Sequence, residues 1–412
     1  MITDLLCDQA IQDSYGVYAG LREHGPVVWL PEHHAWFLST YEAVHDGFRD
    51  QINLSADRLT PLESRLDPEA QTLLGDTFDL LRGWMVFHDP PHHERLKGPV
   101  RRAFTPKAVE NLRPHVEEVV DRCLTEMAAE IAATGQADIV SSLAFPLPAI
   151  VIAELLGVPA EDRDEFKTWS HQLAAIVFGT NNKSTQAATA AAGTARFVSY
   201  FTELIAHYER SPGDNLISAL IAARDLADPP LSSTELVGAC TLLLFGGHET
   251  TTNLIANGTR SLLDHRDQQD WLVEHPASIG QAIEELHRYD GPTKVMVRVA
   301  AKDHERHGAQ LRAGQTVFLG VGSANRDPQR FNYPETLDLQ RPDAMQHLGF
   351  GYGLHFCLGA PLARLEGQIA IGMLMQRFPD LSYAVDPSEI RYSGAILGRS
   401  PLSLPVTSDH VG

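Results

Sequence analysis

The most specific pattern in this chain is Phe350-Gly351-Tyr352-Gly353-Leu354-His355-Phe356-Cys357-Leu358-Gly359. It places one cysteine at the end of a glycine-rich loop, directly before an apolar segment that predicts a helix from about Pro361 to Phe378. Gly351 and Gly353 let the backbone pass close to a flat ligand or adopt torsions that other residues avoid. Cys357 would then lie near a helix N-terminus, where free amides and the helix dipole favour a thiolate. A thiolate with no second cysteine nearby suits haem iron better than zinc or an iron–sulfur cluster.

This stretch resembles the haem-binding signature of cytochromes P450, F-G-x-G-x-H/R-x-C-x-G, at every fixed position. The resemblance implies haem b with Cys357 as the ligand of the iron, and it places Phe350, Gly351 and Gly359 in the loop beside the cofactor. Further family motifs follow in family order between residues 88 and 359, so the resemblance covers essentially the whole chain. It implies the P450 fold, and we expect residues 1–412 to form a single haem domain.

The composition excludes several classes of protein. The net charge of −20 argues against binding to nucleic acid or to an anionic membrane surface. The first residues contain acids and no long apolar run, so we expect neither a signal peptide nor a membrane anchor. Four scattered cysteines indicate a reducing compartment. We therefore expect a cytoplasmic protein that is similar to the soluble bacterial members of the family.

The periodicity of apolar residues predicts a mainly α fold with small peripheral β-sheets, an α+β arrangement. Residues 15–24 read as a short helix, and Val27–Leu30 and Ala35–Leu38 read as two strands joined by a turn. Helical periodicity dominates from Pro106 to about Tyr289. Short strands are expected again at residues 295–300 and at Thr316–Leu319.

A second motif, Gly246-Gly247-His248-Glu249-Thr250-Thr251, lies inside a long apolar helix. That helix should begin near Ser232, with Glu235 completing a capping box, and end near His265. Each glycine in a helix costs roughly 1 kcal/mol relative to alanine, so a sequence with two in a row indicates a local opening or a close approach.

The motif resembles the P450 distal-helix pattern A/G-G-x-D/E-T-T. The resemblance implies that Gly246 and Gly247 let the helix bulge over the haem and leave room for dioxygen. It further implies that Glu249 and Thr250 are catalytic and deliver the protons that oxygen activation needs. His248 occupies the variable position, and we expect it in a solvent-facing or groove position without a part in the reaction.

A third motif, Glu285-Leu286-His287-Arg288, resembles the family's E-x-x-R. Glu285 and Arg288 are three residues apart on a helix and can pair. The family spacing implies that Arg341 joins them in a buried triad below the haem loop, where a charge cluster is stable only when fully paired.

The haem propionates require cationic donors. The segment His88 to Lys97 resembles D-P-P-x-H-x-R-L-R, which implies that His93 and Lys97 bind a propionate. Lysine stands where arginine is usual, so the contact would lose its bidentate geometry. Arg298 and His355 complete the implied set.

Basic residues concentrate in the strip from Arg95 to Arg113, which contains Arg95, Lys97, Arg101, Arg102, Lys107 and Arg113 against Glu110. Such a strip can be an ordinary solvated helix face. The family resemblance places it near the cysteine ligand, where it implies a docking surface for an acidic ferredoxin. Substrate contacts are expected at residues 59–87, 171–178, Leu243, Gly247, 295–296 and 395–397, which are mostly apolar.

These motifs together predict a cytochrome P450 monooxygenase. It would insert one atom of O2 into a small hydrophobic or aromatic organic substrate, with electrons from a ferredoxin and its reductase. Two alternatives stay open. A peroxide-driven P450 is disfavoured by the acid–alcohol pair Glu249 and Thr250, and a non-catalytic haem-thiolate sensor would not need proton delivery.

Overall fold

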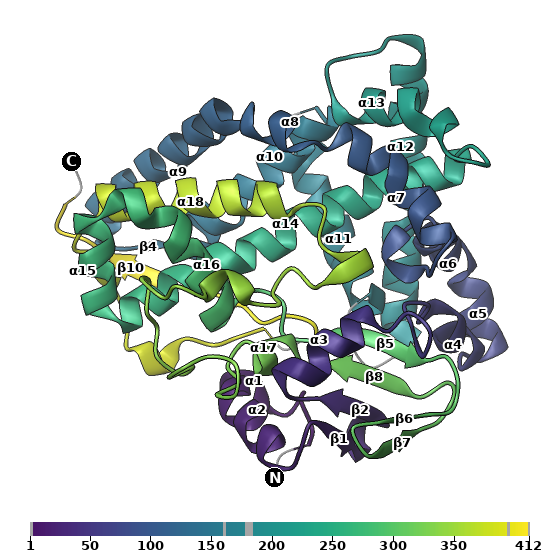
Figure 1. Ribbon diagram of the computed structural model, residues 1–412. Helices are drawn as coiled ribbons and strands as arrows, with labels where there is room; N and C mark the ends of the chain where they lie inside the picture. The colour runs from purple at the N-terminus through teal and green to yellow at the C-terminus, as the bar shows by residue number, and fades with distance from the viewer. Residues whose placement is uncertain (1–2, 160–161, 178–183, 394–395, 411–412) are drawn as a thin grey trace.

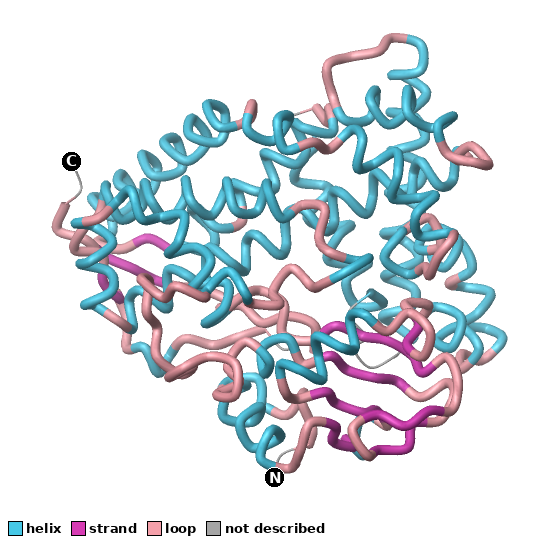
Figure 2. Tube along the Cα trace, in the orientation of Figure 1, coloured by secondary structure: helices cyan, strands magenta, loops and turns pink. Residues whose placement is uncertain are grey.

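The computed structural model describes residues 3–159, 162–177, 184–393 and 396–410. Helices form most of the molecule, and the strands gather in one larger sheet at one end and in smaller sheets at the periphery (Figures 1 and 2). This is the mainly α arrangement with small peripheral sheets that the sequence predicts.

The helices have the following bounds: α1 Asp8–Gln12, α2 Ser14–Glu23, α3 Tyr41–Arg49, α4 Leu59–Ser64, α5 Pro68–Leu73, α6 Gly75–Leu81, α7 His92–Ala103, α8 Pro106–Glu110, α9 Arg113–Thr134, α10 Pro146–Leu156, α11 Arg163–Val177, α12 Ser184–Arg210, α13 Leu216–Ala223, α14 Ser233–Asp264, α15 Arg266–Glu274, α16 Ile279–Asp290, α17 Val321–Ala324 and α18 Ala360–Arg377. The strands are β1 Val27–Leu30, β2 Ala35–Leu38, β3 Leu54–Ser55, β4 Ala137–Asp138, β5 Met296–Ala300, β6 His304–Arg306, β7 Ala309–Leu311, β8 Thr316–Leu319, β9 Ser382–Tyr383 and β10 Pro405–Thr407.

The larger sheet has the strand order β1-β2-β8-β5-β3. Strands β1 and β2 form the expected antiparallel hairpin, with Leu30 opposite Ala35. Strand β8 then pairs with β2 in parallel and with β5 in antiparallel register, so segments nearly three hundred residues apart in sequence become neighbours. Strand β5 begins at Met296, one residue later than expected, because the Val295 amide donates to the Leu397 carbonyl and the pairing with β8 starts at Met296.

The long helix α14 lies at the centre of the main core and packs against α10, α12, α16 and α18 (Figure 1). Its start is the predicted capping box: the Ser232 hydroxyl accepts from the Glu235 amide, and the Glu235 carboxylate accepts from the Ser232 amide. The helical region from Pro106 to Tyr289 is interrupted once by β4, a short strand that the sequence analysis missed. Because α14 and α18 both pack in this core, they hold the residues between them in place.

Within the described residues, no helix is both long enough and apolar enough to span a membrane.

Candidate functional site

The cysteine loop is held by its own backbone. The Cys357 amide donates to the Phe350 carbonyl at 3.0 Å, which closes the loop just before α18. Gly351 and Gly353 have φ values of 71° and 70°, the left-handed region in which glycine carries no steric penalty. This confirms the conformational reason for which the sequence places glycines there.

Cys357 is exposed, yet the protein atoms around it raise the pKa of its thiol by desolvation. The amides of Gly359 and Ala360 and the charge of Lys97 oppose that shift. The sequence argument that the helix terminus favours a thiolate is therefore correct in direction but is outweighed by burial. A coordinating metal cation deprotonates a thiol outright, so a bound metal would reverse the balance.

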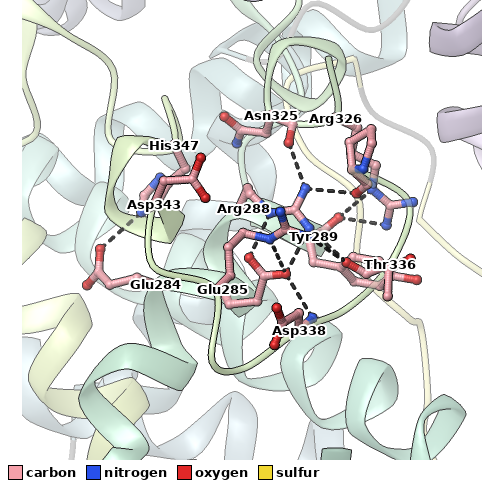
Figure 3. A network of polar contacts seen from close by, with 12 residues as sticks. Glu284, Glu285, Arg288, Tyr289, Asn325, Arg326, Thr336, Asp338, Asp343 and His347 are labelled. Carbon is pink, nitrogen blue, oxygen red and sulfur yellow. Dashed lines mark hydrogen bonds and ion pairs between the residues drawn. The ribbon is translucent and has the colours of Figure 1, made fainter. Parts of the chain in front are cut away.

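Phe350 is fixed by a polar network below the loop. The guanidinium of Arg364 lies 4.5 Å from the centre of the Phe350 ring, and the His287 ring lies 4.4 Å from it. Glu284 accepts from Arg364 at 2.6 Å and is 3.2 Å from Nε2 of His347 (Figure 3). These contacts connect α16 and α18 to the base of the cysteine loop.

The predicted triad is present and completely buried at its centre. Arg288 donates to both carboxylate oxygens of Glu285 at 2.7 and 2.8 Å, and Nε of Arg341 donates to the same carboxylate at 3.1 Å. The Asp338 amide also donates to it at 3.0 Å, and Arg288 reaches the carbonyls of Asn325, Pro334 and Thr336 (Figure 3). A charge cluster at zero exposure has every partner that such burial requires.

Helix α14 carries the second motif and is a continuous α-helix from Ser233 to Asp264, so the bulge expected at Gly246 and Gly247 is not seen in the structure. The two glycines have different surroundings. A Cβ on Gly246 would meet nothing within 4 Å, whereas one on Gly247 would lie 2.8 Å from Ile152 of α10. Gly247 therefore serves close packing between two helices, and any contribution of it to cofactor binding stays a prediction.

Glu249 and Thr250 follow directly. Burial raises the pKa of the Glu249 carboxyl to about 7, which allows it to give and take a proton near neutral pH. The Thr250 hydroxyl is exposed and donates to the Gly246 carbonyl at 2.9 Å. His248 is buried, with Nδ1 2.8 Å from the Leu244 carbonyl, so the expectation of a solvent-facing position is wrong.

Another buried acid near this helix escaped the sequence analysis. Glu366 of α18 is fully buried, and desolvation raises its pKa to about 8, while the Thr251 hydroxyl favours the charged form. Only the packing of α18 against α14 reveals it, because one glutamate in an apolar helix carries no signal of its own.

A cluster of cationic and neutral donors lies beside the cysteine loop. Arg298 of β5 is buried, and within the described residues its guanidinium donates one hydrogen bond, to the carbonyl of its neighbour Val297. The centres of the His93 and His355 rings are 4.2 Å apart. His93 is buried, and its Nδ1 has no hydrogen-bond partner within the described residues. Burial, aided by the nearby cations, lowers the pKa of His93 to about 4 and that of His355 to about 2.

Lys97 belongs to this cluster but contacts the loop itself. Its Nζ donates to the carbonyls of Leu354 at 2.5 Å and Phe356 at 3.3 Å. The nearest acid, Asp89, is engaged by the Ser55 hydroxyl and the Ala56 amide. Within the described residues, Arg298 has no carboxylate partner and Nδ1 of His93 has no hydrogen-bond partner, so the cluster fits an anion with two carboxylates, such as the propionates of a haem.

A cavity of about 170 Å³ lies between β5, β8, α4 and the end of α11. Its lining residues are Arg58, Leu59, Pro61, Leu62, Arg65, Phe87, Ile176, Val177, Val297, Val299, Thr316, Phe318, Ile396 and Leu397. The expected segments 59–87, 171–178 and 395–397 contribute to it, although Phe178 and Ala395 lie outside the described residues. Leu243, Gly247, Val295 and Met296 do not line it, and the sequence analysis missed the strand residues of β5 and β8 and the significance of Arg58.

Within the described residues, only part of the basic strip from Arg95 to Arg113 is free of ion pairs. Arg95 is paired with Glu235, and Arg113 is paired with Glu110 at 2.6 Å. Arg101, Arg102 and Lys107 are exposed and form no ion pair within the described residues. The strip is therefore smaller than its sequence predicts, and its accessible part is confined to the end of α7 and to α8.

Comparisons with known proteins agree along the whole chain. The family model described as "Cytochrome P450" matches residues 23–275 and 279–402. The polyketide biosynthesis cytochrome P450 PksS of Bacillus subtilis is 38% identical over 377 residues, covering 90% of this chain and 89% of PksS. The cytochrome P450 monooxygenase PikC of Streptomyces venezuelae is 38% identical over 398 residues, covering 96% and 91%. The crystal structure of P450BioI, in complex with an acyl carrier protein bearing hexadec-9Z-enoic acid, has a TM-score of 0.88 at 34% identity, covering 98% of this chain and 99% of that one.

Proposed function

Because this chain belongs to the cytochrome P450 family and is a P450 monooxygenase of the bacterial type, we propose that it inserts one atom of O2 into a small, largely hydrophobic organic molecule with electrons from a ferredoxin. Members of the family carry haem b on a cysteine thiolate. We further propose that residues 1–412 form one haem domain. The cellular location stays a prediction.

The observation that carries the proposal is that Cys357 lies beside a cluster of hydrogen-bond donors that can bind an anion. Cys357 would ligate the iron, with Phe350, Gly351 and Gly359 forming the loop around it and Gly246 facing it from α14. Arg298, His93 and His355 would hold the propionates, because they are donors with no carboxylate partner within the described residues. Once bound, the haem supplies the centre at which dioxygen is reduced and one oxygen atom is transferred.

Glu249 and Thr250 would supply protons from the α14 side. The carboxyl of Glu249 titrates near neutral pH and can be reprotonated from solvent. The Thr250 hydroxyl donates to Gly246 in the structure and can turn to donate into the space beside it. This pair favours the use of O2 over a peroxide-driven reaction, which needs no proton delivery.

Lys97 would contact both the cysteine loop and a haem propionate. In the structure it holds two carbonyls of the cysteine loop, so its charge stabilises the loop and favours the thiolate. A propionate within reach would compete for the same ammonium, which has three donors.

Electron delivery would use the accessible part of the basic strip, Arg101, Arg102 and Lys107. On a chain with a net charge of −20, an acidic ferredoxin needs a local positive surface to orient it. Arg101 and Arg102 lie on α7 together with His93 and Lys97, and Lys107 lies on α8, so a partner docked there would approach the side of the cysteine ligand.

Oxygen isotope labelling tests the proposed reaction. The haem-loaded protein is supplied with a ferredoxin, its reductase, NADPH and a set of hydrophobic compounds that perturb its Soret band, under 18O2. The proposal predicts a product with one 18O atom. Product formed only with added hydrogen peroxide would favour the peroxide-driven alternative, and tight binding without any product would favour a sensor.

A further inference from the structure

Arg58 places a positive charge on the wall of an otherwise apolar cavity. It immediately precedes α4 and faces residues of β5, β8 and α11 across the cavity. Of the fourteen lining residues, two are arginines, Arg58 and Arg65, and none is an aspartate or glutamate. The whole chain has 53 acidic and 33 basic residues, so a cavity wall whose only charged residues are basic contrasts with the rest of the protein.

The contacts of Arg58 leave most of its donors free. Its Nη2 donates to the Val177 carbonyl at 2.9 Å, and its guanidinium lies 4.9 Å from the centre of the Phe87 ring. A guanidinium has five N–H donors, and within the described residues the Arg58 side chain forms no other hydrogen bond and no ion pair. Burial and the nearby charge of Arg298 lower its pKa to about 10, and no acid opposes that shift, so the side chain is still charged at neutral pH.

Arg58 is half-buried, and the fully buried arginines of the protein show which partners it lacks. Arg288 meets a carboxylate and three carbonyls, and Arg341 meets the same carboxylate and further carbonyls. A buried charge without such partners is costly, and an apolar substrate that filled the cavity would increase that cost by displacing water from Arg58. A substrate with its own negative charge would instead provide the missing partner.

We propose that the substrate carries an anionic group, a carboxylate or a phosphate or sulfate ester, which Arg58 binds while the apolar remainder packs on Val297, Val299 and Phe318. Arg65, which is exposed, would attract this group at the outer end of the cavity. The inference rests on the proposed monooxygenase function and names its substrate class.

The test compares matched ligands that differ only in charge. Spectral titrations of the haem-loaded protein would use dodecanoate against dodecan-1-ol and 4-phenylbutanoate against 4-phenylbutan-1-ol, with dodecyl phosphate to distinguish carboxylate from phosphate. The variants are Arg58→Gln and Arg58→Lys. Arg312→Gln, which removes an exposed arginine outside the cavity, is the control.

The inference predicts that at least one anion binds wild-type protein more tightly than its uncharged analogue. Loss of one charge-assisted hydrogen-bonded contact should weaken that anion about tenfold or more in Arg58→Gln, with little effect on the alcohol. Arg58→Lys should recover part of the preference, and Arg312→Gln should keep all of it.

Three results would overturn the inference. One is the absence of any preference for the anions in wild-type protein, including no detectable binding of them. Another is an unchanged preference in Arg58→Gln. The third is a loss of haem from Arg58→Gln, which would assign Arg58 to a propionate alongside Arg298. Failure of the proposed function is recognised separately, because it appears as the absence of 18O-labelled product under 18O2, whereas these three outcomes concern ligand binding and haem retention.

Discussion

The imidazole rings of His93 and His355 lie 4.2 Å apart, although they come from α7 and from the cysteine loop more than 250 residues later. Both are neutral in the structure, since burial and the nearby charges of Arg298 and Lys97 lower their pKa values. A bound pair of carboxylates would reverse that balance and raise both pKa values. The two histidines are therefore placed to respond to an anion and to hold it.

We expect His355→Ala to weaken haem retention. Loss of one charge-assisted donor should speed transfer of haem to apomyoglobin by about tenfold. The control is His24→Ala, which alters an exposed histidine of the N-terminal region. Equal rates of haem loss in wild-type protein and His355→Ala would remove His355 from the propionate site.

Glu249 should make turnover depend on pH near neutrality. A carboxyl with a pKa of about 7 is protonated below that pH, so product formation per electron pair should fall as the pH rises through 7. Glu249→Gln cannot titrate and should give low coupling without this dependence. Thr250→Ala should leave substrate affinity nearly intact while peroxide release rises.

The matched control for these two variants is Thr252→Ala, because Thr252 is buried and donates to the His248 carbonyl within α14. An unaltered pH profile in Glu249→Gln would show that protons arrive by another route. A large loss of affinity with normal coupling in Thr250→Ala would place Thr250 in substrate binding instead.

Glu285→Ala should destabilise the fold by about 3–5 kcal/mol, because it leaves Arg288 and Arg341 buried without their carboxylate. Urea unfolding and the yield of haem-loaded protein measure the effect. Glu209→Ala, which breaks the exposed pair with Arg224, should cost at most about 1 kcal/mol. Similar losses for the two variants would contradict the structural role of the triad.

Reversal of the exposed charges Arg101 and Arg102 to glutamate should slow reduction by an acidic ferredoxin. The rate in wild-type protein should also fall as salt rises, because exposed charges act over about 8 Å at physiological ionic strength. Substrate titrations should be unchanged. Arg312→Glu is a suitable control, since it reverses an exposed charge elsewhere. If reduction does not depend on salt and the double reversal has no effect, this surface is an ordinary solvated helix face and does not bind a ferredoxin.

The sequence predicted those features that depend on local pattern. The bounds of α14 and α18, the β1–β2 hairpin and the pairing of Glu285 with Arg288 agree with expectation, because capping, period and spacing are local properties. Arg341, 56 residues after Glu285, was expected only from the family resemblance.

Features that depend on which elements meet in space were not predictable. Gly247 is required by Ile152 of α10, which lies almost a hundred residues earlier. His248 is buried because its side of α14 faces Phe145 and not solvent. Arg58 acquires its place in a cavity only when α4 meets β5 and the end of α11.

The central claim is that Cys357 ligates haem iron, and the carbonyl difference spectrum of the reduced protein tests it most directly. Wild-type protein should show the red-shifted Soret band of a thiolate-ligated haem. Cys357→Ser should abolish that band, while Cys240→Ser, at a buried cysteine of α14, should retain it. Survival of the band in Cys357→Ser, or its absence from haem-loaded wild-type protein, would contradict the account.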